Sequence, residues 1–269
     1  MTSSSDLETI ASADGTQIAY KRTGRGPPLV LVHGTSADHT SWNAITPHLA
    51  DHVTLYAMVR RGRGKSGDTD EYALDREAED VASLVETIGE TVVLFGHSFG
   101  ALCALEAALR TNTLRGLVLY EPVIPVDGHD LYDDHVLAEM QSLLDEGETE
   151  AMLLLFLREV VDLSADQIDA LRASPAWPSR VNAAHTVLRE AAVEEGYVFD
   201  PRRFAELTTP TLLLTGSESA ASITDATTAI AKALPNSRIV TLEGQEHVAY
   251  YTAPELFAET VLEFAREVS

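Results

Sequence analysis

The chain has 269 residues, of which 45% are hydrophobic, so it can bury a core of the size found in one globular unit. Its 42 acidic residues outnumber its 19 basic residues, and the formal net charge of -23 would repel phosphate, which argues against nucleic acid as a partner. The excess of acid favours a salt-adapted source, where screening weakens the self-repulsion, over an acidic proteome without that adaptation.

The start of the chain carries no targeting signal that we can identify. The decapeptide MTSSSDLETI has neither a basic start nor an apolar centre, and no apolar run approaches the length that spans a membrane. We therefore expect a soluble cytoplasmic protein without a membrane partner. The single cysteine, Cys103, cannot form an internal disulfide and is interpreted as a packing residue on a predicted helix.

The predicted elements begin with an antiparallel hairpin over residues 7–20, centred on Asp14 and Gly15. Short apolar, β-rich runs then occupy residues 17–23, 28–34, 53–59, 91–97, 115–121, 210–216 and 237–243. Amphipathic helical patterns occupy residues 75–88, 98–110, 224–234 and 254–268. Strands that are apolar on both faces and alternate with helices predict an α/β fold with a mostly parallel sheet covered on both sides.

One interval, residues 126–206, has no strand pattern. It contains only acidic amphipathic segments, and we interpret it as an all-helical cap subdomain inserted between two strands. The core would then comprise residues 1–125 and 207–269. Because the insertion follows a strand end, it can fold over the edge where open α/β sheets bind ligands.

The stretch Gly96-His97-Ser98-Phe99-Gly100 follows a predicted strand and precedes a predicted helix. G-x-S-x-G in this context forms a sharp turn whose glycines allow backbone crowding and leave the serine exposed above the sheet. The amino end of the following helix favours developing negative charge. The pattern predicts Ser98 as a nucleophile.

Two further loops could complete a site for acyl transfer, which needs two backbone N–H donors and a base. The donors are expected from Phe99 and from Thr35, which follows His33-Gly34 at the end of an earlier strand. His33 is interpreted as a structural residue that bonds the loop backbone. Of nine histidines, His247 lies late enough on a strand-end loop to be the base.

These stretches together resemble the α/β-hydrolase family. GHSFG is similar to the nucleophile elbow, HGT to the oxyanion loop, and GQEH to the histidine loop. The resemblance covers nearly the whole chain outside the helical insertion, and it implies an eight-stranded sheet, antiparallel at its start, with a helical cap after strand six. It also implies a serine hydrolase without cofactor or metal that acts on a small-molecule ester or lactone. The resemblance does not indicate which oligomeric state the protein has.

The acid of the triad has three candidates. The family usually places it after strand seven, in G-x-x-D, but that position is Ser219 here. Some members, haloalkane dehalogenases among them, carry the acid after strand six, where Glu121 ends the stretch LYEP. We favour Glu121, which would bond the Nδ1–H of His247, and keep Glu218 and Asp225 as alternatives.

Other signals are given weaker interpretations. Residues 59–66, VRRGRGKS, end like a phosphate-binding loop but lack its leading glycine, and they resemble the family's loop after strand four. Residues 127–135 contain two histidines and four acids, and we interpret them as a solvated segment at the start of the cap rather than a metal site. We interpret the apolar segment of residues 152–157 as part of the cap core, and the alternative is that Leu155, Phe156 or Trp177 lines an acyl pocket.

The family resemblance does not by itself select a reaction. A serine nucleophile argues against haloalkane dehalogenase and epoxide hydrolase chemistry, which related enzymes perform with an aspartate. Perhydrolases, C–C hydrolases and hydroxynitrile lyases share the fold. The alternative from another class is a ligand-binding or sensor protein that keeps the fold and has little turnover.

Overall fold

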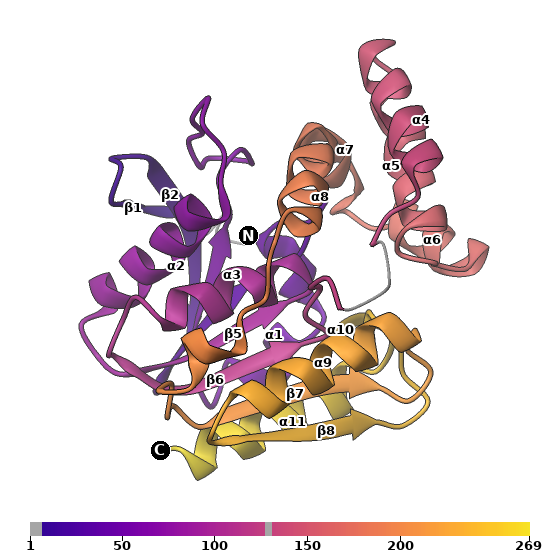
Figure 1. Cartoon of the computed structure of the whole chain (residues 1–269). Coiled ribbons are helices and arrows are strands. Elements are labelled where there is room, and N and C mark those ends of the chain that lie inside the picture. Colours follow the sequence, from indigo (N-terminus) through magenta and orange to yellow (C-terminus); the bar gives the residue numbers. More distant parts are fainter. Residues whose placement is uncertain (1–6, 127–130) are drawn as a thin grey trace.

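A computed structural model describes residues 7–126 and 131–269 of the chain (Figure 1). One eight-stranded sheet runs through the core in the order β1-β2-β4-β3-β5-β6-β7-β8. Its strands are β1 (Glu8–Ala11), β2 (Gln17–Gly24), β3 (Pro28–Val32), β4 (Thr54–Val59), β5 (Val92–His97), β6 (Leu114–Tyr120), β7 (Thr211–Gly216) and β8 (Ser237–Leu242). Residues 1–6, at the start of the N-terminal decapeptide, and residues 127–130 of the acidic stretch lie outside the described residues.

The sheet is antiparallel at one edge and parallel elsewhere. β1 pairs with β2 through a hairpin, and β2 pairs antiparallel with β4. From β4 onward every neighbouring pair is parallel. The predicted eight-stranded, mostly parallel sheet is therefore confirmed. Because the carboxyl ends of parallel strands meet at one edge, the loops after β3, β5, β6, β7 and β8 gather there.

Helices cover both faces of the sheet because successive side chains of each buried strand point to opposite faces. The core helices are α1 (Thr46–Leu49), α2 (Leu74–Ile88), α3 (Phe99–Ala108), α9 (Ala221–Ala233), α10 (Ala249–Thr252) and α11 (Pro254–Glu267), with a 3-10 turn at His39–Asn43. Val30 and Val32 pack in the apolar cluster under α2, α3 and α9, whereas Leu29 and Leu31 pack in the cluster under α1 and α11. Cys103 is buried in the first cluster, as expected of a packing residue.

Between β6 and β7 the regular elements of the described chain are all helical. They are α4 (Asp134–Asp145), α5 (Thr149–Glu159), α6 (Ala165–Arg172), α7 (Trp177–Ala183) and α8 (Val187–Glu195), with 3-10 turns at Ala184–Thr186 and Pro201–Phe204. They share an apolar cluster of their own, and Figure 1 shows α4 to α6 standing out from the core. The helical insertion after β6 is therefore confirmed, while residues 126–206 as the bounds of a separate subdomain stay a prediction. None of the described helices is both long and apolar enough to span a membrane.

The basic loop after β4 pairs its charges inside the protein. Arg60 donates from Nη2 to Glu77 Oε1 over 2.7 Å, and Arg61 donates from Nε to Asp80 Oδ2 over 2.7 Å. Both guanidinium groups are fully buried. A phosphate-binding loop would instead present backbone N–H groups and an unpaired cation to its ligand. The geometry agrees with a structural loop.

The excess of acid leads to a prediction about stability. The 42 acidic residues exceed the 19 basic residues by 23, and these uncompensated negative charges repel one another within one 269-residue unit. Raising the salt concentration shortens the screening length from about 30 Å at 0.01 M to about 3 Å at 1 M. We expect the Tm to rise by about 5 °C or more over this range. Thermal unfolding followed by circular dichroism in a NaCl series measures the shift, and a constant Tm would contradict a salt-adapted source.

Candidate active site

Ser98 lies on a sharp turn between β5 and α3. Its backbone has φ 55° and ψ -127°, a conformation that non-glycine residues rarely adopt. The flanking glycines allow the turn, because a β-carbon at Gly96 would lie 2.4 Å from the carbonyl oxygen of Gly100, and one at Gly100 would lie 2.4 Å from that of His33. The turn places Ser98 at the wall of two cavities. The N–H of Phe99 lies at the amino end of α3, where helical N–H groups have no carbonyl partner within the helix.

Backbone strain is concentrated around this serine. In residues 7–126 and 131–269, four non-glycine residues have a positive φ, namely Ser36, Ser98, Glu121 and Asp162. All four line one or both of the cavities at Ser98. Such conformations cost about 1–3 kcal/mol each and persist where the surrounding structure enforces them, which is typical of active sites.

The loop after β3 approaches Ser98 closely. A β-carbon at Gly34 would lie 3.0 Å from Cβ of Ser98, and Thr35 lines both cavities beside it. Nδ1 of His33 donates to the carbonyl oxygen of Gly34 over 2.9 Å, and its Nε2 accepts the backbone N–H of Arg60 over 3.2 Å. Burial, and then the charges of nearby arginines, holds the pKa of His33 well below its ordinary value, so the ring is neutral. His33 thus bonds loop backbone, as predicted.

Glu121 and His247 form a hydrogen-bonded pair beside Ser98. Oε2 of Glu121 lies 2.7 Å from Nδ1 of His247, and the glutamate side chain is fully buried. Burial alone would raise the pKa of Glu121, but its hydrogen bonds and the charge of His247 hold that pKa below its ordinary value. An ionised Glu121 accepts a hydrogen bond from Nδ1–H of His247. This leaves Nε2 as the ring nitrogen of His247 that can accept a proton from a group in the cavities.

The loop after β7 holds the other oxygen of Glu121. Oε1 accepts the backbone N–H of Gly216 over 2.8 Å and the hydroxyl of Ser219. Ser219 occupies the position where the aspartate of the G-x-x-D pattern was expected, so this position supplies a hydrogen-bond donor to Glu121 in place of a carboxylate. The alternative acids, Glu218 and Asp225, are both exposed.

Two side chains outside the predicted set hold the loop that carries His247. His97 donates from Nε2 to the carbonyl oxygen of His247 over 2.9 Å. The hydroxyl of Tyr120 accepts the N–H of Ala249 over 2.9 Å and donates to the carbonyl oxygen of Glu246. Burial, and then the charge of His247, holds the pKa of His97 well below its ordinary value, so its ring is a neutral donor. In the sequence these two residues could have been found by their positions, because each directly precedes a predicted catalytic residue.

Comparison with known proteins decides the family. Residues 29–260 match the model of the Alpha/beta hydrolase family. The chain belongs to this family. It is 24% identical over 253 residues to 2-(acetamidomethylene)succinate hydrolase of Mesorhizobium japonicum, over 91% of this chain and 90% of that protein. It is 27% identical over 255 residues to a pimeloyl-(acyl-carrier protein) methyl ester esterase of Aeromonas hydrophila, over 92% and 98% of the two chains. An α/β hydrolase of Sphaerobacter thermophilus matches it with a TM-score of 0.82 and 35% identity, over 96% of this chain and 99% of that one.

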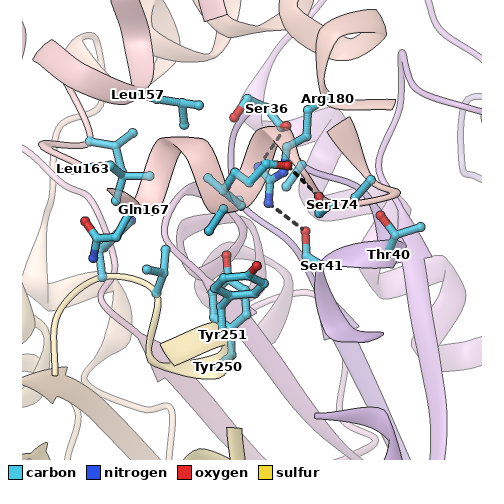
Figure 2. Close-up of a pocket in the computed structure, with 18 of the residues that line it drawn as sticks. Ser36, Thr40, Ser41, Leu157, Leu163, Gln167, Ser174, Arg180, Tyr250 and Tyr251 are labelled. Carbon is cyan, nitrogen blue, oxygen red and sulfur yellow. Dashed lines mark hydrogen bonds between the residues drawn. The ribbon is translucent and has the colours of Figure 1, made fainter. Parts of the chain in front are cut away.

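In this α/β hydrolase, Ser98 and His247 lie between two cavities. The larger has a volume of about 530 Å³, and its wall includes apolar side chains of α5 and α6 together with residues of the loop after β3 (Figure 2). The smaller has a volume of about 180 Å³ and is lined in part by acidic side chains of the cap and of the loop after β7. Of the three cap residues considered for an acyl pocket, Phe156 lines both cavities, whereas Leu155 and Trp177 pack in the cap cluster.

A buried ionic network joins the cap to the core behind Thr35. Arg60 and Arg63 of the core both contact Glu190 of α8, and Glu190 also accepts a hydrogen bond from the Thr35 side chain. Burial would raise the pKa of Glu190, but the two arginines hold it below its ordinary value. Glu194 lies one turn further along α8, and burial raises its pKa to about 8. The cap therefore meets the core through charged groups at the loop that carries Thr35.

Proposed function

We propose that this α/β hydrolase is a cofactor-independent serine hydrolase that cleaves a small carboxylic ester or lactone through an acyl-enzyme intermediate. The observation that carries the proposal is the 2.7 Å contact between Glu121 and His247 at cavities that Ser98 also lines. A serine on a strained turn, a histidine held by a carboxylate and two backbone donors are the groups that acyl transfer requires.

In the first half-reaction, Oγ of Ser98 attacks the carbonyl carbon of the ester while Nε2 of His247 takes the hydroxyl proton. The carboxylate of Glu121 stabilises the imidazolium that forms. Negative charge moves to the carbonyl oxygen, which accepts hydrogen bonds from the N–H groups of Thr35 and Phe99. The bond to the leaving oxygen then breaks as His247 gives its proton to that oxygen, and the alcohol is released.

In the second half-reaction, a water molecule attacks the acyl carbon and gives one proton to Nε2 of His247. The bond between the acyl carbon and Oγ of Ser98 breaks as the proton returns to that oxygen. The products are a carboxylic acid and the original serine. A lactone follows the same steps, but the alcohol stays attached to the acyl chain and the product is a hydroxy acid.

The relatives support hydrolysis and differ in the bond that they cleave. One is named as a methyl ester esterase and another as a hydrolase of 2-(acetamidomethylene)succinate. We favour an ester because its leaving oxygen departs as a neutral alcohol when His247 protonates it, and no further group is needed. A perhydrolase or a C–C hydrolase would use the same nucleophile with another second substrate or another leaving group.

Labelling by a fluorophosphonate together with hydrolysis of 4-nitrophenyl butyrate tests the proposal. We expect the probe to label Ser98 and to stop the release of 4-nitrophenolate, because both reactions need the same nucleophilic hydroxyl. Peptide mapping by mass spectrometry identifies the labelled residue. A label on another residue would contradict the assignment of Ser98, and the absence of both labelling and turnover would favour a ligand-binding protein.

A further inference from the structure

Arg180 is a buried cation at the wall of the large cavity. It lies on α7 and is 8% exposed, and Figure 2 shows its side chain extending from the cap toward the loop after β3. Its guanidinium donates to the carbonyl oxygen of Ser36 over 3.3 Å and to the hydroxyl of Ser41 over 3.4 Å, and it hydrogen-bonds Tyr250. These partners are neutral. Within the described part of the chain, its Nε is buried without a hydrogen-bond partner.

The partners of the Arg180 guanidinium differ from those of the other buried arginines. Arg60, Arg61 and Arg63 each contact at least one carboxylate. By contrast, none of the residues that the structure describes provides a carboxylate at the wall of the large cavity, although the chain has 42 acidic residues. A buried charge without a counter-ion is strongly unfavourable unless a ligand supplies the opposite charge.

We propose that Arg180 binds a carboxylate of the substrate, so that the protein cleaves esters or lactones carrying a second, free carboxylate group. The inference rests on the proposed function, because it places the anion in the cavity of the same nucleophile. A guanidinium presents parallel N–H donors that match the two oxygens of a carboxylate. Its contacts of 3.3 and 3.4 Å to Ser36 and Ser41 are long, and a carboxylate at about 2.7–2.9 Å would be the stronger partner.

The position of Arg180 places this subsite near the reacting carbonyl. Its charge contributes, after burial and His247, to the lowered pKa of His97, the residue directly before Ser98. Its two serine partners lie on the loop after β3, which also carries Thr35. The cavity that both Arg180 and Ser98 line has a volume of about 530 Å³, which is enough for a small acyl chain. The carboxylate and the scissile ester can thus belong to one small molecule.

Paired esters that differ only in charge test the subsite. Mono-4-nitrophenyl glutarate and its methyl ester place the difference on the acyl side, and 4-acetoxybenzoate and its methyl ester place it on the leaving group. For at least one pair, we expect kcat/KM to be about tenfold to a hundredfold higher for the anion, although the net charge of the protein repels it. In Arg180→Gln the ratio of kcat/KM for the anionic ester to kcat/KM for its neutral partner should fall to about 1 or below, mainly through a change in KM.

Two control variants separate recognition of an anion from packing of the cap. Arg172→Gln removes an equal charge from α6, where Arg172 is half-exposed and paired with Glu150. Ser179→Ala removes a neighbouring contact between α7 and Asp38 without a change of charge. Neither should alter the ratio. Arg180→Lys keeps the charge without the planar fork and should retain part of the preference, and it replaces Arg180→Gln if that variant does not fold.

Calorimetric binding of glutarate separates the failure of this proposal from the failure of the proposed function. If none of the four esters is hydrolysed, the esterase proposal fails, and the subsite is judged by binding alone. The wild type should then bind glutarate about tenfold or more tightly than Arg180→Gln does. Equal cleavage of anionic and neutral esters by the wild type, an equal loss for both members of a pair in Arg180→Gln, or equal glutarate binding would overturn the subsite.

Discussion

Ser98→Ala is expected to lower kcat for ester hydrolysis by about 10⁴-fold or more. The alanine lacks the oxygen that forms the acyl-enzyme, so neither half-reaction can take place. The variant keeps a β-carbon on a backbone whose φ of 55° is enforced by the crowding at Gly96 and Gly100. We therefore expect its Tm to lie within about 2 °C of the wild type.

Rates of 4-nitrophenyl butyrate hydrolysis and thermal melts of both proteins measure this result. Ser142→Ala is a suitable control, because it removes a hydroxyl from the exposed surface of α4, away from both cavities, and should leave kcat close to that of the wild type. A folded Ser98→Ala protein with a near-normal rate would remove Ser98 from the mechanism.

Glu121→Gln is expected to lower kcat by up to about 10⁴-fold, by analogy with a triad acid made neutral. Oε1 of Glu121 accepts hydrogen bonds from Gly216 and Ser219, so the glutamine oxygen should take that position and its NH₂ group should face Nδ1 of His247. An NH₂ donor favours the tautomer with the proton on Nε2. That tautomer cannot accept the proton of Ser98.

Glu218→Gln is the matched control for the acid. It makes the same change of atoms on the exposed loop after β7, and kcat should stay close to the wild-type value. Because the pKa of Glu121 lies below its ordinary value, its carboxylate is charged at neutral pH and its own titration does not disturb the comparison. A larger loss in Glu218→Gln than in Glu121→Gln, measured in the same ester assay, would move the acid to the loop after β7.

The acid can follow either β6 or β7 because these strands are neighbours in the sheet. Parallel neighbours end at the same edge, so a side chain from either strand end can reach the histidine loop. In this chain the two loops act together, since Glu121 comes from one and Gly216 and Ser219 of the other donate to it. We therefore expect Ser219 to help orient the carboxylate.

The amino-acid sequence by itself predicts the strands, the helices and the nucleophilic turn. Buried parallel strands are continuous apolar runs, and the structure has its strands within a few residues of the predicted ones. The turn at Ser98 is equally local, because Gly96 and Gly100 are required where backbone atoms occupy the place of a β-carbon. His247 follows from its position in the order of the strand-end loops.

Only the tertiary structure decides which acid faces the histidine. Glu121, Glu218 and Asp225 are alike in sequence as carboxylates near strand ends. Their orientation depends on the order of the strands in the sheet and on the φ of 47° that Glu121 adopts at the end of β6. Neither property is encoded by a local pattern, because both are set by the packing of segments that are distant in the chain.

The same reason explains why the sequence did not identify the charged groups around the cavities. Arg63 and Glu190 form a buried pair although they are 127 residues apart, and Arg180 has no carboxylate partner in the described part of the chain. In sequence, all three are ordinary charges on amphipathic or loop segments. Whether a charge is paired, exposed or available to a ligand is determined by distances across the fold, which composition and periodicity do not contain.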